Sequence, residues 1–260
     1  MRVRFPWFFT LLIGLAMFPA VGHSAENASP VEFLLAGATD AELEPLLAKL
    51  ESPRLESRAA WHFWRGTLAG KQVVLTRTEG DPLNAVAATT LAIRRYAPKL
   101  IVTFGASRAH DPAMHAGDLL VSEKFAAFDG LVSEVASLGG GCAPLTWNKL
   151  PHLLASPGEK ETPVYFFAAD PRALAAAKSL VPARGRVFVG VPGSAEQVNR
   201  EADRIAWIRA QWGTSSEDGE SAHIAGCAQL LGVPVIALRV IDGNEGEAAA
   251  DALKLVEGWK

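Results

Sequence analysis

Short continuous runs of apolar residues occur along the chain, and such runs predict strands buried on both faces of a sheet. The clearest is KLIVTFG at 99–105, in which every residue after the first lysine is uncharged. An alanine–glycine pair at 69–70 separates two further runs and predicts a turn between two short strands. Strands are therefore expected at 31–37, on both sides of the turn within 62–78, at 99–105, at 117–128, at 186–193 and at 233–241.

Segments with apolar residues at helical spacing lie between these runs. One of them ends at Pro98, and a proline commonly follows the end of a helix. Another begins with Glu217, Asp218 and Glu220, and carboxylates are favoured at a helix start by the helix dipole. Helices are therefore expected at 40–52, 84–98 and 200–212, from about 217 into the apolar stretch that follows, and at 245–259.

Alternation of strands and helices predicts an α/β fold with helices on both faces of the sheet. Ligands of such folds usually bind at the carboxyl ends of the strands. Residues 37–42, 105–108 and 242–244 follow three of the predicted strands, so a binding site is expected among them. The segment 139–163 is rich in glycine and proline, and its composition suits a surface excursion over a pocket.

The amino terminus differs from the rest of the chain. Arg2 and Arg4 precede an apolar run from Phe5 to about Val21, and small residues follow up to Ala25. This order is typical of a secretory signal peptide, and an uncleaved membrane anchor is the alternative. We expect residues 1–25 to be removed, 26–30 to form a tether, and 31–260 to form one domain. The mature protein would then be periplasmic or secreted and would lie outside the membrane.

Composition narrows the class of protein. Hydrophobic residues make up 49% of the 260 residues and charged residues 20%, as in globular proteins. The formal net charge is −3, and loss of the two arginines in 1–25 would make it −5. No basic stripe with interleaved aromatic residues is present, so nucleic acid is not expected as a partner.

The pattern of cysteine and histidine residues gives no sign of a metal site or a cofactor. The histidines are scattered, and none stands near a cysteine at the spacing of a metal-binding motif. Cys142 and Cys227 could pair in an exported chain, but Cys227 lies within an apolar stretch, where a small buried thiol is common. Pairing of the two cysteines stays open.

Five segments in order resemble the nucleoside phosphorylase/nucleosidase superfamily, and within it the methylthioadenosine/S-adenosylhomocysteine nucleosidase-like branch. The resemblance runs from about Val31 to the carboxyl terminus. It implies a three-layer α/β/α sandwich around a mixed, partly barrel-like sheet, and a homodimer or larger homo-oligomer. The segments are AGATDAELEPLL, GDPLNAVAATTLAIRRYAPKLIVTFGAS, AGDLLVSE, VGVPGSAEQVNREADRI and EDGESAHIAGCAQLLGVPVIALRVID.

The resemblance also implies roles for single residues. Glu42 aligns with the glutamate that activates water, and Glu220 aligns with the glutamate that holds the ribose hydroxyls. Asp242 is the candidate for the acid that protonates the leaving base. The implied substrate-binding positions further include Gly219, Ala106, Ser107, Val198, Asn199 and Asn244. By contrast, Glu217 and Asp218 are expected to be ordinary helix-start charges.

Three positions depart from the family pattern. Asp242 stands where the family has serine, and Gly243 stands where it has the catalytic aspartate. One residue along a strand turns a side chain to the opposite face, so Asp242 reaches the base only if the strand end bulges. Gly219 replaces a methionine that lines the ribose, and Val198 replaces the aromatic residue that stacks on the purine.

Three functions follow from this pattern. The first is an exported nucleosidase that hydrolyses a purine nucleoside or 5'-thio-nucleoside. The second is a catalytically degenerate protein that binds a nucleoside or another small ligand on the same fold. The third is a purine nucleoside phosphorylase, which needs a phosphate site. The first loop, 37–42, is acidic and has no arginine. Arg108 could serve as an anion ligand, but a surface arginine is the commoner explanation.

Overall fold

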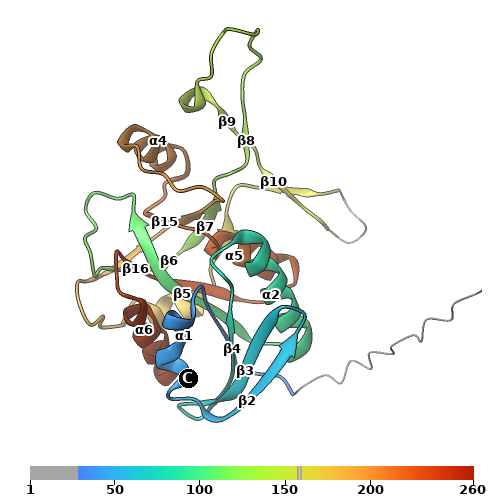
Figure 1. The fold of residues 1–260 in the computed structure, drawn as a ribbon, viewed down its shortest axis with the longest axis vertical. Coiled ribbons are helices and arrows are strands. Elements are labelled where there is room, and N and C mark those ends of the chain that lie inside the picture. Colours follow the sequence, from blue (N-terminus) through green and yellow to red (C-terminus); the bar gives the residue numbers. More distant parts are fainter. Residues whose placement is uncertain (1–28, 157, 159) are drawn as a thin grey trace, which may run out of the picture.

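The computed structural model describes residues 29–260 with the exception of 157 and 159 (Figure 1). The predicted signal peptide, 1–25, lies outside the described residues, as do 26–28 of the predicted tether. Within the described residues, no helix is both long enough and apolar enough to cross a bilayer. Both cysteines are free thiols, Cys142 exposed and Cys227 buried.

One strand, β5 (Leu100–Ala109), organises a mixed sheet of twelve strands. It pairs in parallel with β1 (Phe33–Gly37) on one side and with β16 (Val235–Ile241) on the other. Near its carboxyl end it also pairs antiparallel with the short strand β15 (Ser216–Asp218). The carboxyl ends of these strands therefore meet in one region, as the sequence predicted.

One edge of the sheet is an antiparallel meander of β2 (Glu51–Arg58), β3 (Trp61–Leu68) and β4 (Lys71–Arg77). The hairpin at 69–70 is confirmed. The expected helix over 40–52 is too long, because α1 (Asp40–Leu47) ends early and β2 begins at Glu51. The strand β2 could not be found by hydrophobic pattern, because seven of its eight residues are exposed at the sheet edge.

The other strands form two branches from β5 and β16. One branch runs through β15 to β14 (Pro192–Ser194), β7 (Lys124–Ala127) and β12 (Phe167–Ala168); the other joins β16 to β6 (Leu119–Ser122) and β13 (Val187–Gly190). The single strands expected at 117–128 and 186–193 are thus each two short strands that pair with different neighbours.

Helices cover both faces of the sheet, which confirms the predicted fold class (Figure 1). On one face α1 packs beside α6 (Glu245–Gly258), and α3 (Pro171–Ala177) joins them over a core that includes Phe33, Phe104 and Leu238. On the other face α2 (Pro82–Tyr96) packs against α5 (Ser221–Leu230). The helix α4 (Ala202–Trp212) packs its Ile208 and Trp212 against Phe128.

The segment between β7 and β12 projects away from the sheet (Figure 1). It contains two antiparallel ribbons, β8 (Leu131–Val132) with β9 (Asn148–Lys149), and β10 (His152–Leu154) with β11 (Thr162–Val164). A 3₁₀ turn, η1, spans Pro144–Thr146. The segment is an excursion at the surface, as predicted, and that it covers a pocket stays a prediction.

Candidate active site

A buried arginine stands at the centre of the charged groups near the strand ends. Arg239, on β16, is the largest fully buried side chain of the described residues. Its Nη2 donates to Thr103 Oγ1 on β5 at 2.8 Å. Its Nε lies 3.2 Å from Asp218 Oδ2, and its Nη2 lies 3.6 Å from Glu220 Oε1. A buried charge needs partners of opposite sign, and two carboxylates supply them here.

Glu220 is the N-cap residue of α5 and is 1% exposed. Its Oε2 accepts a hydrogen bond from Thr78 Oγ1. Its Oε1 is buried without a hydrogen-bond partner. Burial raises the pKa of Glu220 to about 7, although Arg239 and Thr78 act to lower it. A carboxylate with one unsatisfied oxygen can still accept hydrogen bonds from a ligand.

Asp218 fixes the backbone that carries Glu220. Its Oδ1 accepts from the backbone N–H groups of Glu220 and Ser221 at 2.8 and 2.7 Å, and from Ser194 Oγ at 2.9 Å. Burial alone would raise the pKa of Asp218, but Arg239 and Ser221 bring the pKa below its ordinary value. Asp218 therefore stays ionised and holds the turn before α5 in place.

The expectation that Glu217 and Asp218 are helix-start charges is wrong. Both lie on β15, where Glu217 pairs with Arg108 of β5 and with Gly193 of β14. The helix α5 begins only at Ser221, with Glu220 as its N-cap residue. The three-residue strand has no apolar alternation, so its pairing became visible only in the folded sheet.

Glu42 reaches the same region from α1 and is 5% exposed. Its Oε2 accepts from the N–H of Ala38 at 2.6 Å, and its Oε1 accepts from the N–H of Ala106 at 3.2 Å. Gly105 allows this approach: a Cβ there would lie 2.5 Å from Glu42 Oε1 and 2.7 Å from Arg239 Nη1. Glu42 and Arg239 thus flank one glycine of β5.

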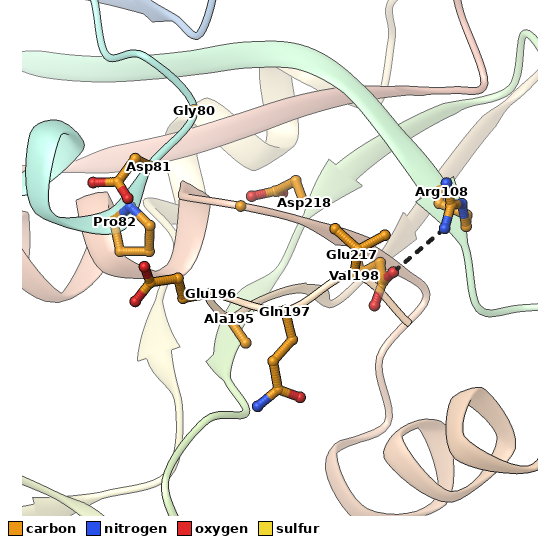
Figure 2. A pocket seen from close by; sticks show the side chains of 11 residues that line it. Gly80, Asp81, Pro82, Arg108, Ala195, Glu196, Gln197, Val198, Glu217 and Asp218 are labelled. Atoms are coloured by element: carbon orange, nitrogen blue, oxygen red, sulfur yellow. Dashed lines mark ion pairs between the residues drawn. The ribbon is translucent and has the colours of Figure 1, made fainter. Parts of the chain in front are cut away.

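A cavity of about 480 Å³ opens beside this cluster and is called the site cavity below (Figure 2). Figure 2 shows Asp81 and Pro82 at one end and Arg108 at the other, with Asp218 between them. Its volume is in the range that holds a small molecule. It is lined by Gly80, Asp81, Pro82, Arg108, Ala195, Glu196, Gln197, Val198, Glu217, Asp218 and Gly219.

Gly219 lies at the meeting point of the cavity and the carboxylate cluster. A Cβ at this position would collide with the carbonyl oxygen of Gly80. The turn before α2 therefore occupies the space in which a side chain at 219 would stand. This contact explains the glycine at the position where the family has methionine.

A second polar network forms one wall of the site cavity. His110 is buried, with Nδ1 2.7 Å from Thr214 Oγ1 and Nε2 3.1 Å from Glu217 Oε2. Asn199 donates to Glu217 twice, from its backbone N–H at 3.1 Å and from Nδ2 at 2.7 Å. Burial acts to raise the pKa of Glu217, but His110 and Asn199 lower it overall. The network ties the loop that carries Val198 to β15.

The side chains of the predicted residues at the end of β16 form no hydrogen bond or ion pair with this cluster, although the backbone N–H of Asp242 donates to the carbonyl oxygen of Ser107 at 2.9 Å. Asp242 is exposed, has a φ of 40°, and is absent from the cavity lining. Asn244 is also exposed, and its side chain caps α6 by accepting from the N–H of Gly246 at 3.2 Å. A Cβ at Gly243 would stand 2.9 Å from Glu247 Oε2 and would overlap Val240. No side chain from 242–244 lines the site cavity.

The other predicted positions divide between the two networks. Ala106 offers its N–H to Glu42, and the Oγ of the buried Ser107 has no hydrogen-bond partner. Val198 is 69% exposed and lines the cavity, while Asn199 is buried beneath it. The structure therefore brings together Glu42 and Glu220 around Arg239, with Gly219 and Val198 at the cavity.

The sequence patterns predicted no role for Arg239 or His110. For Arg239 a usable pattern exists: it is the one charged residue in the apolar run VIALRVI, and a charge buried there requires acidic partners. For His110 no local pattern points to Glu217, because the two residues are far apart in the chain and meet only through the pairing of β5 with β15.

Comparison with known proteins identifies the family. The family model described as "Phosphorylase superfamily" matches residues 32–257. The chain belongs to this superfamily. The matched residues include α1, which carries Glu42, α5, which Glu220 caps, and β16, which carries Arg239.

Relatives of this superfamily member are named as nucleosidases. A 5'-methylthioadenosine/S-adenosylhomocysteine nucleosidase of Marinomonas sp. (strain MWYL1) is 24% identical over 223 residues, which cover 85% of this chain and 89% of the relative. One of Aeromonas salmonicida (strain A449) is 24% identical over 228 residues, with 85% and 91% covered.

Solved structures share the fold. The nucleosidase of the same name from Neisseria meningitidis, in complex with methylthio-immucillin-A, matches with a TM-score of 0.68 at 22% identity, covering 87% of this chain and 96% of that one. The one from S. pneumoniae gives a TM-score of 0.71 at 17% identity, covering 90% and 100%. Futalosine hydrolase of Helicobacter pylori gives a TM-score of 0.66 at 18% identity, covering 87% of this chain and 95% of that one.

Proposed function

We propose that this phosphorylase-superfamily protein is a nucleosidase that hydrolyses the N-glycosidic bond of a purine nucleoside or 5'-thio-nucleoside. One observation carries the proposal. Glu42 and Glu220 converge around the buried Arg239, Glu220 directly follows the cavity-lining Gly219, and Glu220 Oε1 is buried without a hydrogen-bond partner. The names of the relatives support the same class of reaction.

Glu220 suits the sugar end of the reaction. Breaking the bond between the sugar carbon and the base nitrogen builds positive charge on the ribose, as in other glycoside hydrolyses. The unsatisfied Oε1 of Glu220 would accept from a ribose hydroxyl, and its negative charge would stabilise the cationic sugar. The raised pKa of Glu220 means that the ionised form is gained as the pH rises through about 7.

Glu42 suits the attacking water. It would accept a proton from the water whose oxygen forms the new bond to the sugar carbon, while the bonding electrons leave with the base. Its carboxylate is held by the N–H groups of Ala38 and Ala106, so its orientation is set before a ligand binds. This preorganisation is what a general base needs.

Hydrolysis is favoured over phosphorolysis by the charge of the first loop. Residues 37–42 contain Asp40 and Glu42 and no arginine, and the neighbouring Arg77 is paired with Asp40 at 2.7 Å and with Glu79 at 2.6 Å. A phosphate dianion would meet mainly carboxylates at this loop. Phosphorylase activity is the further alternative.

The second candidate is a degenerate binding protein, and a specific observation favours it. The family places its catalytic aspartate at a position that is glycine here, and the neighbouring Asp242 is exposed and absent from the cavity lining. Without a proton donor at that position, a nucleoside would bind in the site cavity and remain intact. Superfamily folds host such proteins.

Release of free base tests the proposal. We would incubate the purified protein with methylthioadenosine, adenosine and inosine, each with and without phosphate, and quantify the base by chromatography. The proposal expects phosphate-independent release from at least one of them, and a hundredfold or greater loss of rate in Glu42→Gln. Absence of turnover on all three would refute it, and thermal stabilisation without product would favour the binding protein.

Export and assembly are separate parts of the proposal. We propose that residues 1–25 direct export and are removed, which mass determination of the protein from the cell envelope would test. We also propose a homodimer or larger homo-oligomer, which light scattering would test. A protein that retains residue 1 in the cytosol would contradict the first of these.

A further inference from the structure

Arg108 is the one cationic side chain among the residues that line the site cavity. It lies on β5 directly opposite Glu217 of β15, with Nη1 4.0 Å from Glu217 Oε1. Figure 2 shows the two side chains together at the end of the cavity away from Asp81. The side chain of Arg108 is 45% exposed, so it is open to solvent, unlike that of Arg239, while it stays close to Glu217.

The guanidinium of Arg108 is anchored and still has donors to spare. Its Nη1 donates to the carbonyl oxygen of Asn199 at 3.1 Å. A guanidinium carries five N–H donors in a planar fork and no acceptor. Since Asn199 follows Val198, this bond holds the fork next to the loop residue that stands at the base-stacking position of the family.

Glu217 fixes this end of the cavity and does not compete for a ligand's donors. Both of its oxygens already accept hydrogen bonds, Oε1 from Asn199 and Oε2 from Asn199 and His110. Its pKa is lowered by these bonds, so it stays ionised and keeps Arg108 close. At this end of the cavity, Arg108 is therefore the charged group with hydrogen-bonding capacity free for a base.

We propose that Arg108 reads the base and makes the site selective for 6-oxopurine nucleosides over 6-aminopurine nucleosides. The inference rests on the proposed function, since it takes the ligand to be a nucleoside with its ribose at Gly219 and Glu220. The base then extends along the site cavity toward Val198 and Arg108.

The chemistry of the two base classes separates them. A 6-oxopurine presents two neighbouring acceptors, O6 and N7, which match the planar fork of an arginine; a 6-aminopurine presents a donor in place of O6. When a guanidinium N–H faces that amino group, two donors meet and neither has an acceptor. A good pair of this kind discriminates between bases by about 10- to 100-fold.

Arg108 also supplies what the end of β16 lacks. When the bond from the sugar carbon to N9 breaks, the electron pair stays on the base, and the negative charge spreads to N7 and O6. N–H donors at these atoms stabilise the departing base before it takes a proton from water. A proton donor at position 243 is then unnecessary, which is consistent with the glycine found there.

Calorimetric binding of hypoxanthine and adenine, together with turnover of inosine and adenosine, tests the proposal. In the wild-type protein we expect hypoxanthine to bind at least tenfold more tightly than adenine, and inosine to have at least a tenfold higher kcat/KM than adenosine. In Arg108→Met, which keeps the length and removes the donors, both ratios should fall to within threefold of one. Arg108→Lys keeps the charge without the fork and should retain only part of the preference.

A matched control is Arg94→Met, an exposed arginine on α2 that does not line the site cavity; it should keep both ratios. Circular dichroism of each variant verifies folding, and Arg108→Gln replaces any variant that fails. Equal or tighter binding of adenine, a preference unchanged in Arg108→Met, or no binding of either base would overturn the inference. A phosphate-dependent reaction lost in Arg108→Met would overturn it by assigning Arg108 to an anion.

These outcomes separate the inference from the proposed function. Arg108-dependent preference for hypoxanthine without any turnover supports base recognition and refutes hydrolysis. Hydrolysis of adenosine and inosine at equal rates supports the nucleosidase and refutes the role of Arg108.

Discussion

Arg239 Nε lies 3.2 Å from Asp218 Oδ2, with both side chains almost completely removed from solvent. The pair joins β16 to β15, which are not neighbours in the sheet because β5 lies between them. Glu220 and Glu42 add two further negative charges around the arginine, and each of them, like Asp218, acts to raise the pKa of Arg239. The two candidate reaction carboxylates are thus held by one buried cation.

Arg239→Met tests this dependence. The substitution keeps an unbranched side chain but leaves Asp218 and Glu220 buried without a counter-charge, so we expect the free energy of unfolding to fall by about 3–5 kcal/mol. Urea denaturation followed by circular dichroism measures it, with Arg94→Met as the control. A loss below about 1 kcal/mol would contradict the structural role.

The pKa of Glu220 predicts a pH dependence of stability. Its folded-state pKa, about 7, is raised above the ordinary value of 4.5, so the folded state holds the proton more tightly than the unfolded state. The resulting stabilisation is complete below 4.5 and is lost as the pH rises through about 7. We expect this loss to be on the order of 1–3 kcal/mol.

Glu220→Gln, which does not titrate, isolates that contribution. Urea unfolding at pH 5, 6, 7 and 8 should show the wild-type protein losing stability relative to the variant as the pH rises. A difference in unfolding free energy that stays constant across these four values would show that Glu220 has an unshifted pKa.

Gly219→Ala tests the close approach of two turns. The added Cβ meets the carbonyl of Gly80, so the turns before α2 and α5 must separate, at a cost of about 1–3 kcal/mol. Thermal unfolding should show a lower Tm. Gly258→Ala, at a position where nothing lies within 4 Å of an added Cβ, is the matched control and should not lower it.

Asp242→Asn tests the residue that the family resemblance made a candidate acid. Its side chain is exposed and does not line the site cavity, so we expect kcat/KM on the best substrate to stay within threefold of wild type. Asparagine tolerates the positive φ of 40°, which makes the change conservative. A loss of a hundredfold or more would restore Asp242 as the general acid.

Asn244→Ala tests the helix cap. Removal of the side chain frees the N–H of Gly246 at the start of α6 and should cost about 1 kcal/mol of stability. Turnover should be unaffected, because Asn244 lies outside the site cavity. A change in KM without a change in stability would instead indicate a contact with substrate.

The sequence by itself determined the class of fold and most of the elements. Buried strands such as β1, β5 and β16 are largely apolar runs, and amphipathic helices repeat their apolar residues at helical spacing, so both leave a local pattern. The ordered motifs also led to Glu42 and Glu220, which the structure brings together. Local pattern failed at β2 and β15, where short or exposed strands carry polar residues.

Tertiary structure decided how the charged residues are used. Nothing local distinguishes Glu217 and Asp218 from helix-start acids, yet pairing of β15 with β5 and β14 makes one the partner of His110 and the other the partner of Arg239. Likewise, Asp242 and Arg108 are both charged residues near strand ends, and only the direction of the backbone places Arg108 at the cavity and Asp242 in solvent. The energy of a charge depends on the groups that surround it, and those groups come from distant parts of the chain.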